Sequence, residues 1–129
     1  MAFSDYLENK VLGHVFGGTA YTAPTTLYVA LYTVAPSDTG GGTEVSGGGY
    51  ARQTSTFNVS GTNPTEATNA SAIEYPEATA NYGTVVAVGV FDALTSGNLL
   101  AYSTLTTSKT IDSGDVFRIN SGNLDITLA

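Results

Sequence analysis

Side chains suited to acid–base chemistry are few in this sequence, and no motif groups them. His14 is the only histidine, and the chain has no cysteine. A histidine needs a nearby carboxylate or nucleophile to act as a general acid or base, and no motif supplies one beside His14. We therefore predict that His14 lies on the surface or at an interface, where protonation at about pH 6 could tune assembly.

Two acidic motifs resemble fragments of functional sites. Asp112-Ser113-Gly114-Asp115 has the paired oxygens and the glycine of a calcium loop but not the rest of its pattern, and aspartate also commonly begins a turn. Glu74 and Glu77 could be proposed as a glycosidase pair, but a working pair needs a shaped cleft that spacing alone does not imply. We predict a turn and a solvated strand end. The sequence thus predicts no metal site, no cofactor and no catalytic residue, and we do not expect an enzyme.

The glycine runs and the tyrosines are two further features that could form binding sites. The runs Gly40-Gly41-Gly42 and Gly47-Gly48-Gly49 belong to a long loop, Ala35–Gly49, that lacks the pattern of a phosphate-binding loop. Loops of this length are functional or mobile, and we expect this one to be ordered only by a neighbouring protein. Eight tyrosines without a tryptophan could form a platform for sugar rings. A small carbohydrate-binding module is therefore one alternative function.

The composition limits both the fold and the partners. A chain of 129 residues has room for one domain with a core, and 42% of its residues are hydrophobic while 12% are charged. A formal net charge of −7 disfavours binding to phosphate backbones and anionic lipids, so we expect no nucleic acid and no membrane as partner. No apolar run is long enough to span a bilayer, and the first residues lack the pattern of a signal peptide.

One segment near the start of the chain has the pattern of a helix. Ser4 is a suitable N-cap, acidic residues follow it, and Gly17-Gly18 is a suitable end. A single apolar stripe with helical spacing consists of Leu7, Val11, Leu12, Val15 and Phe16. A helix of about 12 residues is not stable alone in water, so its stripe must dock on this domain or on a neighbouring subunit.

After Pro24 the pattern changes to the two-residue period of strands. The predicted strands are Thr25–Thr33, Arg52–Val59, Ser71–Tyr75, Gly83–Phe91, Asn98–Leu105, Thr107–Ile111, Asp115–Asn120 and Leu124–Leu128. Both faces of the first strand are apolar enough for a central position, and Ser60–Asn69 is predicted to be a second long loop. We therefore expect a mainly β protein, an antiparallel β-sandwich or small barrel (residues 19–129), with one short amphipathic helix as an N-terminal docking arm (residues 1–18).

Several stretches of the sequence carry a family resemblance. They are Met1–Lys10, Tyr28–Tyr32, Gly49–Gln53, Val88–Asp92, Gly97–Tyr102, Gly114–Ile119 and Leu124–Leu128. Over nearly its whole length the chain resembles a group of small tailed-phage virion proteins, usually labelled tail-fibre or minor tail proteins and similar to β-sandwich capsid cement proteins. The resemblance implies a virion structural protein without catalytic residues, assembled in the host cytoplasm.

The position in the particle has two alternatives at this stage. As a cement protein, the chain would bind the major capsid protein on the outside of the head, most simply as a homotrimer. As a tail-fibre or tail-tip component, it would bind another tail protein and present loops to the host. A fibre normally needs a long shaft with repeats or heptads, and the sequence has neither. We therefore favour a capsid cement protein, with the tail fibre as the alternative.

The partner interface is predicted from the helical stripe together with three tyrosines and one arginine of later segments. Its residues are Leu7, Val11, Val15, Phe16, Tyr28, Tyr32, Tyr50 and Arg52. Burial of the four stripe residues in this set, Leu7, Val11, Val15 and Phe16, would contribute roughly 6–10 kcal/mol before ordering costs. The stripe is therefore expected to be the anchor through which the protein binds other virion polypeptides.

Overall fold

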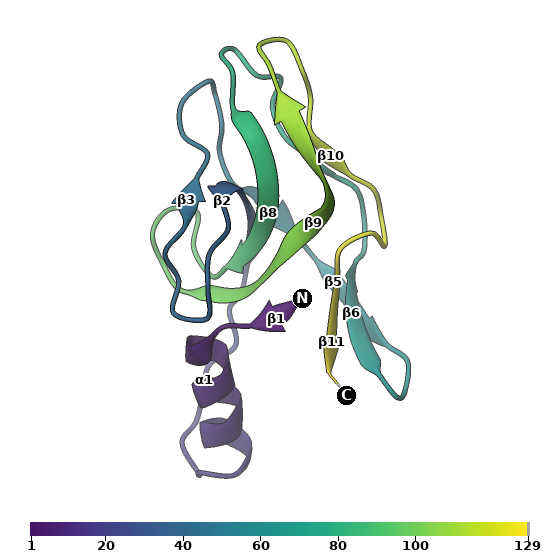
Figure 1. Ribbon diagram of the computed structural model, residues 1–129. Coiled ribbons are helices and arrows are strands. Elements are labelled where there is room, and N and C mark those ends of the chain that lie inside the picture. Colours follow the sequence, from purple (N-terminus) through teal and green to yellow (C-terminus); the bar gives the residue numbers. More distant parts are fainter. Residues whose placement is uncertain (129) are drawn as a thin grey trace.

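A computed structural model describes residues 1–128 and shows one helix and a set of antiparallel sheets (Figure 1). The elements are β1 (Ala2–Phe3), α1 (Asp5–Val15), β2 (Leu27–Val34), β3 (Thr43–Glu44), β4 (Gln53–Ser55), β5 (Phe57–Ser60), β6 (Thr65–Asn69), β7 (Ile73–Glu74), β8 (Gly83–Phe91), β9 (Leu99–Ile111), β10 (Arg118–Ile119) and β11 (Asp125–Leu128). The predicted class, mainly β with antiparallel sheets and one N-terminal helix, is confirmed.

The largest sheet has the strand order β1-β9-β8-β2-β3, and β4 also pairs with β2. β8 and β9 form a hairpin, in which Phe91 lies opposite Leu99. β2 lies between β8 on one side and β3 and β4 on the other, as its two apolar faces predicted. The β-branched run of β8 explains its central place, because such residues favour strands that are buried on both faces.

Two smaller sheets form the second layer of the protein. β5, β6 and β11 make a three-stranded sheet with β6 in the middle, and β7 pairs with β10. The main core lies between the layers. The large sheet contributes Val29, Leu31, Val85, Val88 and Ile111 to it, and the second layer contributes Ile73, Tyr75, Phe117 and Leu124. The arrangement is a sandwich whose second layer is divided into two parts.

α1 begins and ends where the sequence predicted. The Ser4 side chain accepts a hydrogen bond from the Leu7 backbone N–H at 3.2 Å, and Phe16 is the C-cap. Ser4 is itself buried, and its hydroxyl donates to the Leu99 carbonyl of the main sheet. Beyond this attachment the helix extends away from the body and has no buried residue (Figure 1).

The structure corrects several strand predictions. Asn98–Leu105 and Thr107–Ile111 are one strand, β9, whose register with β8 shifts between Val85 and Ala87. The segment Arg52–Val59 divides at Thr56 into β4 and β5, which belong to different sheets. The predicted loop Ser60–Asn69 contains β6, a polar strand that pairs on both edges.

β1 is a further strand, which the sequence analysis missed because two residues carry no period. Ala2 and Phe3 pair with Tyr102 and Ala101 of β9, so the first residues of the predicted arm belong to the main sheet. The division into residues 1–18 and 19–129 otherwise stays a prediction, and residue 129 lies outside the described residues.

The loop Ala35–Gly49 is held by the chain itself, which corrects the expectation that a neighbour must order it. β3 within it pairs with β2, and Val45 is buried in the core. The Thr79 backbone N–H donates to the Gly48 carbonyl at 2.9 Å. Gly42 has a φ of +73°, and a Cβ there would lie 2.6 Å from the Val34 carbonyl oxygen, so only glycine fits this close turn.

Candidate functional site

The residues considered for acid–base chemistry lie at the surface. His14 is exposed, as predicted, and its Nδ1 accepts a hydrogen bond from the Tyr21 backbone N–H at 3.1 Å. In residues 1–128 no three His, Cys, Asp or Glu side chains are grouped closely enough to hold a metal ion. The chemistry-bearing residue types therefore form no common site in the described part of the chain.

Both acidic motifs have the simpler role that was predicted. In the Asp112–Asp115 turn, the Asp115 N–H donates to the Asp112 carbonyl at 3.0 Å, and the Asp112 N–H donates to Asp115 Oδ2 at 2.9 Å. Glu74 and Glu77 are both exposed, and Glu74 Oε1 lies 3.5 Å from Nη1 of Arg118. The first motif is a turn, and the second is a solvated strand end.

The eight tyrosines do not form a platform at the surface. Three of them are buried, namely Tyr32, Tyr75 and Tyr82, and the other five are half-buried. Within the core, the rings of Tyr50 and Tyr75 stack with centroids 6.1 Å apart, and Tyr82 meets Tyr50 edge-on at 5.9 Å. Because these three rings pack on one another, they do not contribute to a sugar-binding platform.

Arg52 joins two loops beside the main sheet. Its Nε and Nη2 donate to the two carboxylate oxygens of Glu44, each at 2.9 Å, and Nη1 donates to the carbonyls of Ala93 and Ser96 at 2.9 and 2.8 Å. The guanidinium carbon also lies 3.7 Å from the centre of the Phe91 ring. Arg52 is 8% exposed. Its hydrogen bonds and its ring contact are therefore all made within the chain.

The tyrosines around this pair are held in their neutral form. Desolvation by burial, together with the charge of Glu44, raises the pKa of Tyr32 to about 12. Desolvation, and the hydrogen bond that its hydroxyl donates to Glu44 Oε2 at 2.6 Å, raise the pKa of Tyr50 far above its usual range. These groups fasten β3 and the segment that precedes β4 to the core and to the loop between β8 and β9. They have a structural role in this arrangement.

The predicted interface residues therefore separate into two groups. Tyr32, Tyr50 and Arg52 make internal contacts in or beside the main sheet, and Tyr28 is half-buried on β2. The other four predicted residues belong to the helical stripe, on α1 and at its C-cap, Phe16. Leu7 and Val11 are half-buried near the base of α1, whereas Val15 is 61% exposed and Phe16 is 81% exposed. The structure does not bring the two groups together.

The three-stranded sheet carries a second apolar surface that the sequence analysis missed. Val59, Ala67 and Ile126 are paired across it and so point to one face, which Leu128 continues. The opposite face carries Asn58, Ser60, Glu66, Thr68, Asp125 and Thr127. Val59 is 71% exposed and Leu128 is 60% exposed. The alternation Leu124, Ile126, Leu128 was the signal available in the sequence.

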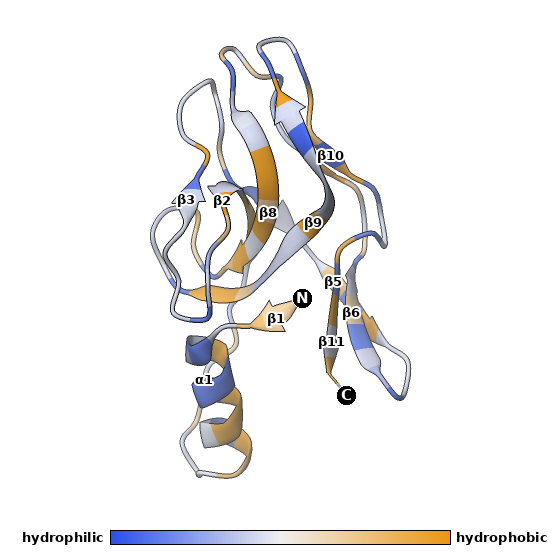
Figure 2. Cartoon of the chain, viewed as in Figure 1, coloured by the Kyte–Doolittle hydropathy of each residue, from blue (hydrophilic) through white to orange (hydrophobic). Residues whose placement is uncertain are grey.

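These two apolar regions extend from the same end of the molecule. Figure 1 shows α1 and the free end of the three-stranded sheet pointing in the same direction, and Figure 2 shows hydrophobic residues along both. We call α1 and the three-stranded sheet the arms, and their exposed apolar side chains the arm surface: Leu12, Val15, Phe16, Val59 and Leu128. Complete covering of the three α1 residues would contribute roughly 3–6 kcal/mol before ordering costs. An exposed apolar surface of this kind is typical of a protein interaction site.

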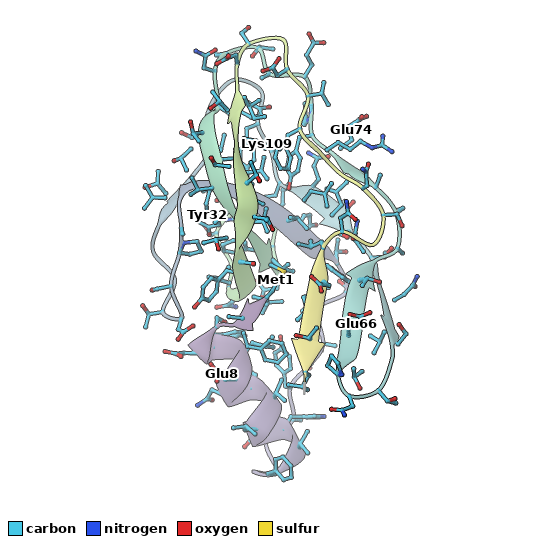
Figure 3. All side chains as sticks on the ribbon, turned by 45° about the vertical axis from the view of Figure 1, so that its right-hand side comes forward. Met1, Glu8, Tyr32, Glu66, Glu74 and Lys109 are labelled. Atoms are coloured by element: carbon cyan, nitrogen blue, oxygen red, sulfur yellow. The ribbon has the colours of Figure 1, made fainter. Side chains whose placement is uncertain are left out.

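A groove runs between α1 and the end of β11, with a volume of about 530 Å³. We call it the arm groove. Its apolar lining includes Phe3, Val11, Leu12 and Leu128, and the carboxylates of Glu8 and Asp38 also line it. Figure 3 shows Glu8 on α1 and Met1 at the start of β1. The groove is therefore continuous with the arm surface through Leu12 and Leu128.

The comparisons with known proteins identify one family. No helix within residues 1–128 is both long enough and apolar enough to cross a membrane. A search of curated proteins finds no match. A family model described as "Podophage GP4 fiber I protein gp80" matches residues 2–127, nearly the whole chain, and so confirms the resemblance to tailed-phage virion proteins.

Proposed function

Because the chain belongs to the podophage GP4 fiber I protein gp80 family, we propose that it is a non-enzymatic structural part of a phage fibre that binds other virion polypeptides through the arm surface. The match covers residues 2–127, so it includes both the arms and the sandwich. The observation that carries the proposal is the set of large apolar side chains that the chain leaves uncovered on α1 and the three-stranded sheet. In water such a surface is best explained by a partner that covers it.

We place a position in the fibre ahead of the capsid cement function that the sequence analysis favoured, although no finding contradicts the cement function. The family description names a fibre protein, and this supports the tail-fibre alternative for the present chain. One observation still favours a cement protein: residues 1–128 form a β-sandwich with one short helix and contain no shaft-like element. We therefore keep capsid decoration, by binding to the major capsid protein, as the second candidate.

The number of copies in the virion separates these two candidates. Purified particles would be digested, and this chain would be quantified by mass spectrometry against the major capsid protein. A fibre component is expected at roughly a few to a few tens of copies per particle, and a cement protein at hundreds, following the symmetry of each structure. Hundreds of copies would overturn the fibre proposal, and the absence of the chain from particles would overturn both.

We also propose that the free chain assembles in the host cytoplasm as a homotrimer. Strand β5 is paired on one side only, and such an edge can be continued by another chain. The mass of the purified protein, measured by light scattering, tests this. Three chain masses of 13.2 kDa are expected, and a concentration-independent monomer would contradict it.

A further inference from the structure

The arm groove combines apolar and acidic side chains, which limits what can bind there. Its lining includes two acidic residues, Glu8 and Asp38, and six apolar residues, Met1, Ala2, Phe3, Val11, Leu12 and Leu128. The amino group of Met1 is held by the Asp125 carbonyl, so the two acidic residues outnumber the one cationic group on the lining. An apolar groove of this size fits one or two large side chains of a partner. A purely apolar partner would leave the two carboxylates without a charged partner, whereas a partner with lysine or arginine would pair with them.

The acidic character continues on the other side of the first turn of α1. Asp38 also lines a second hollow of about 520 Å³, together with Asp5. The Tyr102 hydroxyl donates to the Asp38 carboxylate, and the pKa of Tyr102 is raised first by this hydrogen bond, then by desolvation and by the charges of Asp38, Asp5 and Glu8. Three carboxylates therefore act on one hydroxyl at the base of α1. Near them, the Met1 amino group donates to the Asp125 carbonyl at 3.2 Å.

A second copy of this chain has few cations with which to match these carboxylates. The chain contains four Lys and Arg residues. Arg52 is buried against Glu44, and Arg118 lies beside Glu74. Lys10 is on α1 itself, with its ammonium 5.5 Å from the centre of the Tyr6 ring. Lys109, exposed on β9 and away from α1 (Figure 3), and the exposed side chain of Arg118 are thus the cations that remain for contact with a second copy.

Contact between two copies through the arm groove would also bring like charges together. Around a twofold axis, the same surface of each copy faces the other, so Glu8 and Asp38 of one copy would meet the same carboxylates of the second. Like charges at an interface oppose binding, and the formal net charge of −7 adds to this repulsion. The groove therefore suits a protein of different composition.

We propose that the arm groove binds a segment of a different virion protein, one that presents an apolar side chain flanked by lysine or arginine. The proposal rests on the proposed function, because it names the chemistry of the partner that covers the arm surface. The apolar side chain would lie against Val11, Leu12 and Leu128, and the basic groups would pair with Glu8 and Asp38. Apolar burial would supply affinity, and the charges would supply selectivity and speed of association.

The experiment uses particles of a phage mutant that lacks this chain, to which the purified protein is added back. Two variants alter the groove: Glu8→Lys reverses one carboxylate, and Leu12→Asp places a charge on the apolar wall. Two matched controls make the same changes elsewhere, Glu77→Lys at an exposed strand end and Leu94→Asp at a side chain 51% exposed, against 58% for Leu12. Thermal unfolding shows whether each variant folds, and Glu8→Gln replaces Glu8→Lys if the latter does not.

The wild type and both controls should bind the particles equally, while Glu8→Lys and Leu12→Asp bind at least about tenfold more weakly. Raising the salt concentration should weaken wild-type binding and leave the residual binding of Glu8→Lys less affected. Wild-type affinity in both groove variants would overturn this inference while leaving the proposed function intact. Groove variants that bind particles normally but change the mass of the free protein would identify a second copy as the occupant and overturn it too. Failure of the wild type itself to bind would overturn the proposed function and this inference together.

Discussion

Leu31 in β2 and Leu12 in α1 are the same residue type in opposite environments, with exposed fractions of 0% and 58%. Around Leu31 the two layers of the sandwich supply the covering residues. The Tyr50 hydroxyl accepts a hydrogen bond from the Leu31 N–H at 3.0 Å and donates one to Glu44. Around Leu12, residues 1–128 supply no second layer. The arms thus have the pattern of a core without the residues that complete one, which is typical of a surface completed by a partner.

The largest expected effect compares these two leucines directly. Leu31→Ala leaves a cavity in a packed core and should lower the free energy of unfolding by about 2–5 kcal/mol. Leu12→Ala removes a side chain that is already mostly in water and should change it by less than about 0.5 kcal/mol. Urea denaturation of both variants measures the difference. Equal losses would show that α1 packs on the body in solution and would remove the contrast.

The second comparison concerns two arginine–glutamate pairs. Arg52→Ala removes the partner of Glu44, whose side chain is 26% exposed, and frees the carbonyls of Ala93 and Ser96, so a loss of about 3 kcal/mol is expected. Arg118→Ala breaks an exposed pair and should cost no more than about 0.5 kcal/mol. Thermal unfolding compares the two. If both cost the same, the Arg52 network does not fasten the loops as described.

Ser4 joins α1 to the main sheet, and its replacement should lower the free energy of unfolding by less than the loss of Leu31 or Arg52. Ser4→Ala loses both the N-cap of α1 and the hydrogen bond to the Leu99 carbonyl, at an expected cost of about 1–2 kcal/mol. Hydrogen exchange should show faster exchange in α1 and unchanged protection in β8. Unchanged exchange in α1 would mean that contacts beyond Ser4 hold the helix in place.

The smallest expected effect concerns the raised pKa of the buried tyrosines, which changes the free energy of unfolding only at alkaline pH. The pKa of Tyr32 is raised to about 12 by burial and by Glu44, whereas the value in the unfolded chain is about 10. Because the folded value is the higher one, the stabilisation is complete below pH 10 and is lost as the pH rises toward 12. Tyrosinate absorbance should therefore show a cooperative step that coincides with unfolding. A smooth titration of all eight tyrosines near pH 10 in the folded protein would contradict this.

The sequence predicted those elements whose signals are local. The N-cap at Ser4 and the run Gly83–Phe91 fixed α1 and β8 within about a residue. Strand β6 was missed because Thr65–Asn69 has few apolar residues and is a strand only through pairing with β5 and β11. β9 was divided in two because the shifted register beside Val85 interrupts its alternation.

The site was predicted in part for the same reason. The spacing of the helical stripe predicted which residues share a face of α1. It did not predict what covers that face, so the exposure of Val15 and Phe16 could not be foreseen. Tyr32 and Arg52 were chosen as interface residues, yet both pack against Phe91, which is distant from them in the sequence, and Arg52 is also paired with Glu44. The apolar face with Val59 and Leu128 depends on the pairing of three strands. Pairings between distant segments cannot be predicted from the pattern of any one segment.

The most direct test of the central claim is side-chain footprinting of Phe16 and Val59 in the free protein and in the intact particle. Hydroxyl radicals oxidise exposed side chains, and these two are 81% and 71% exposed in the isolated chain. Phe16 and Val59 should be oxidised rapidly in the free protein and several-fold more slowly in the particle, while Leu94, which lies outside the arms, keeps its rate. Equal oxidation of Phe16 and Val59 in both states would contradict the claim that the arms bind other virion polypeptides.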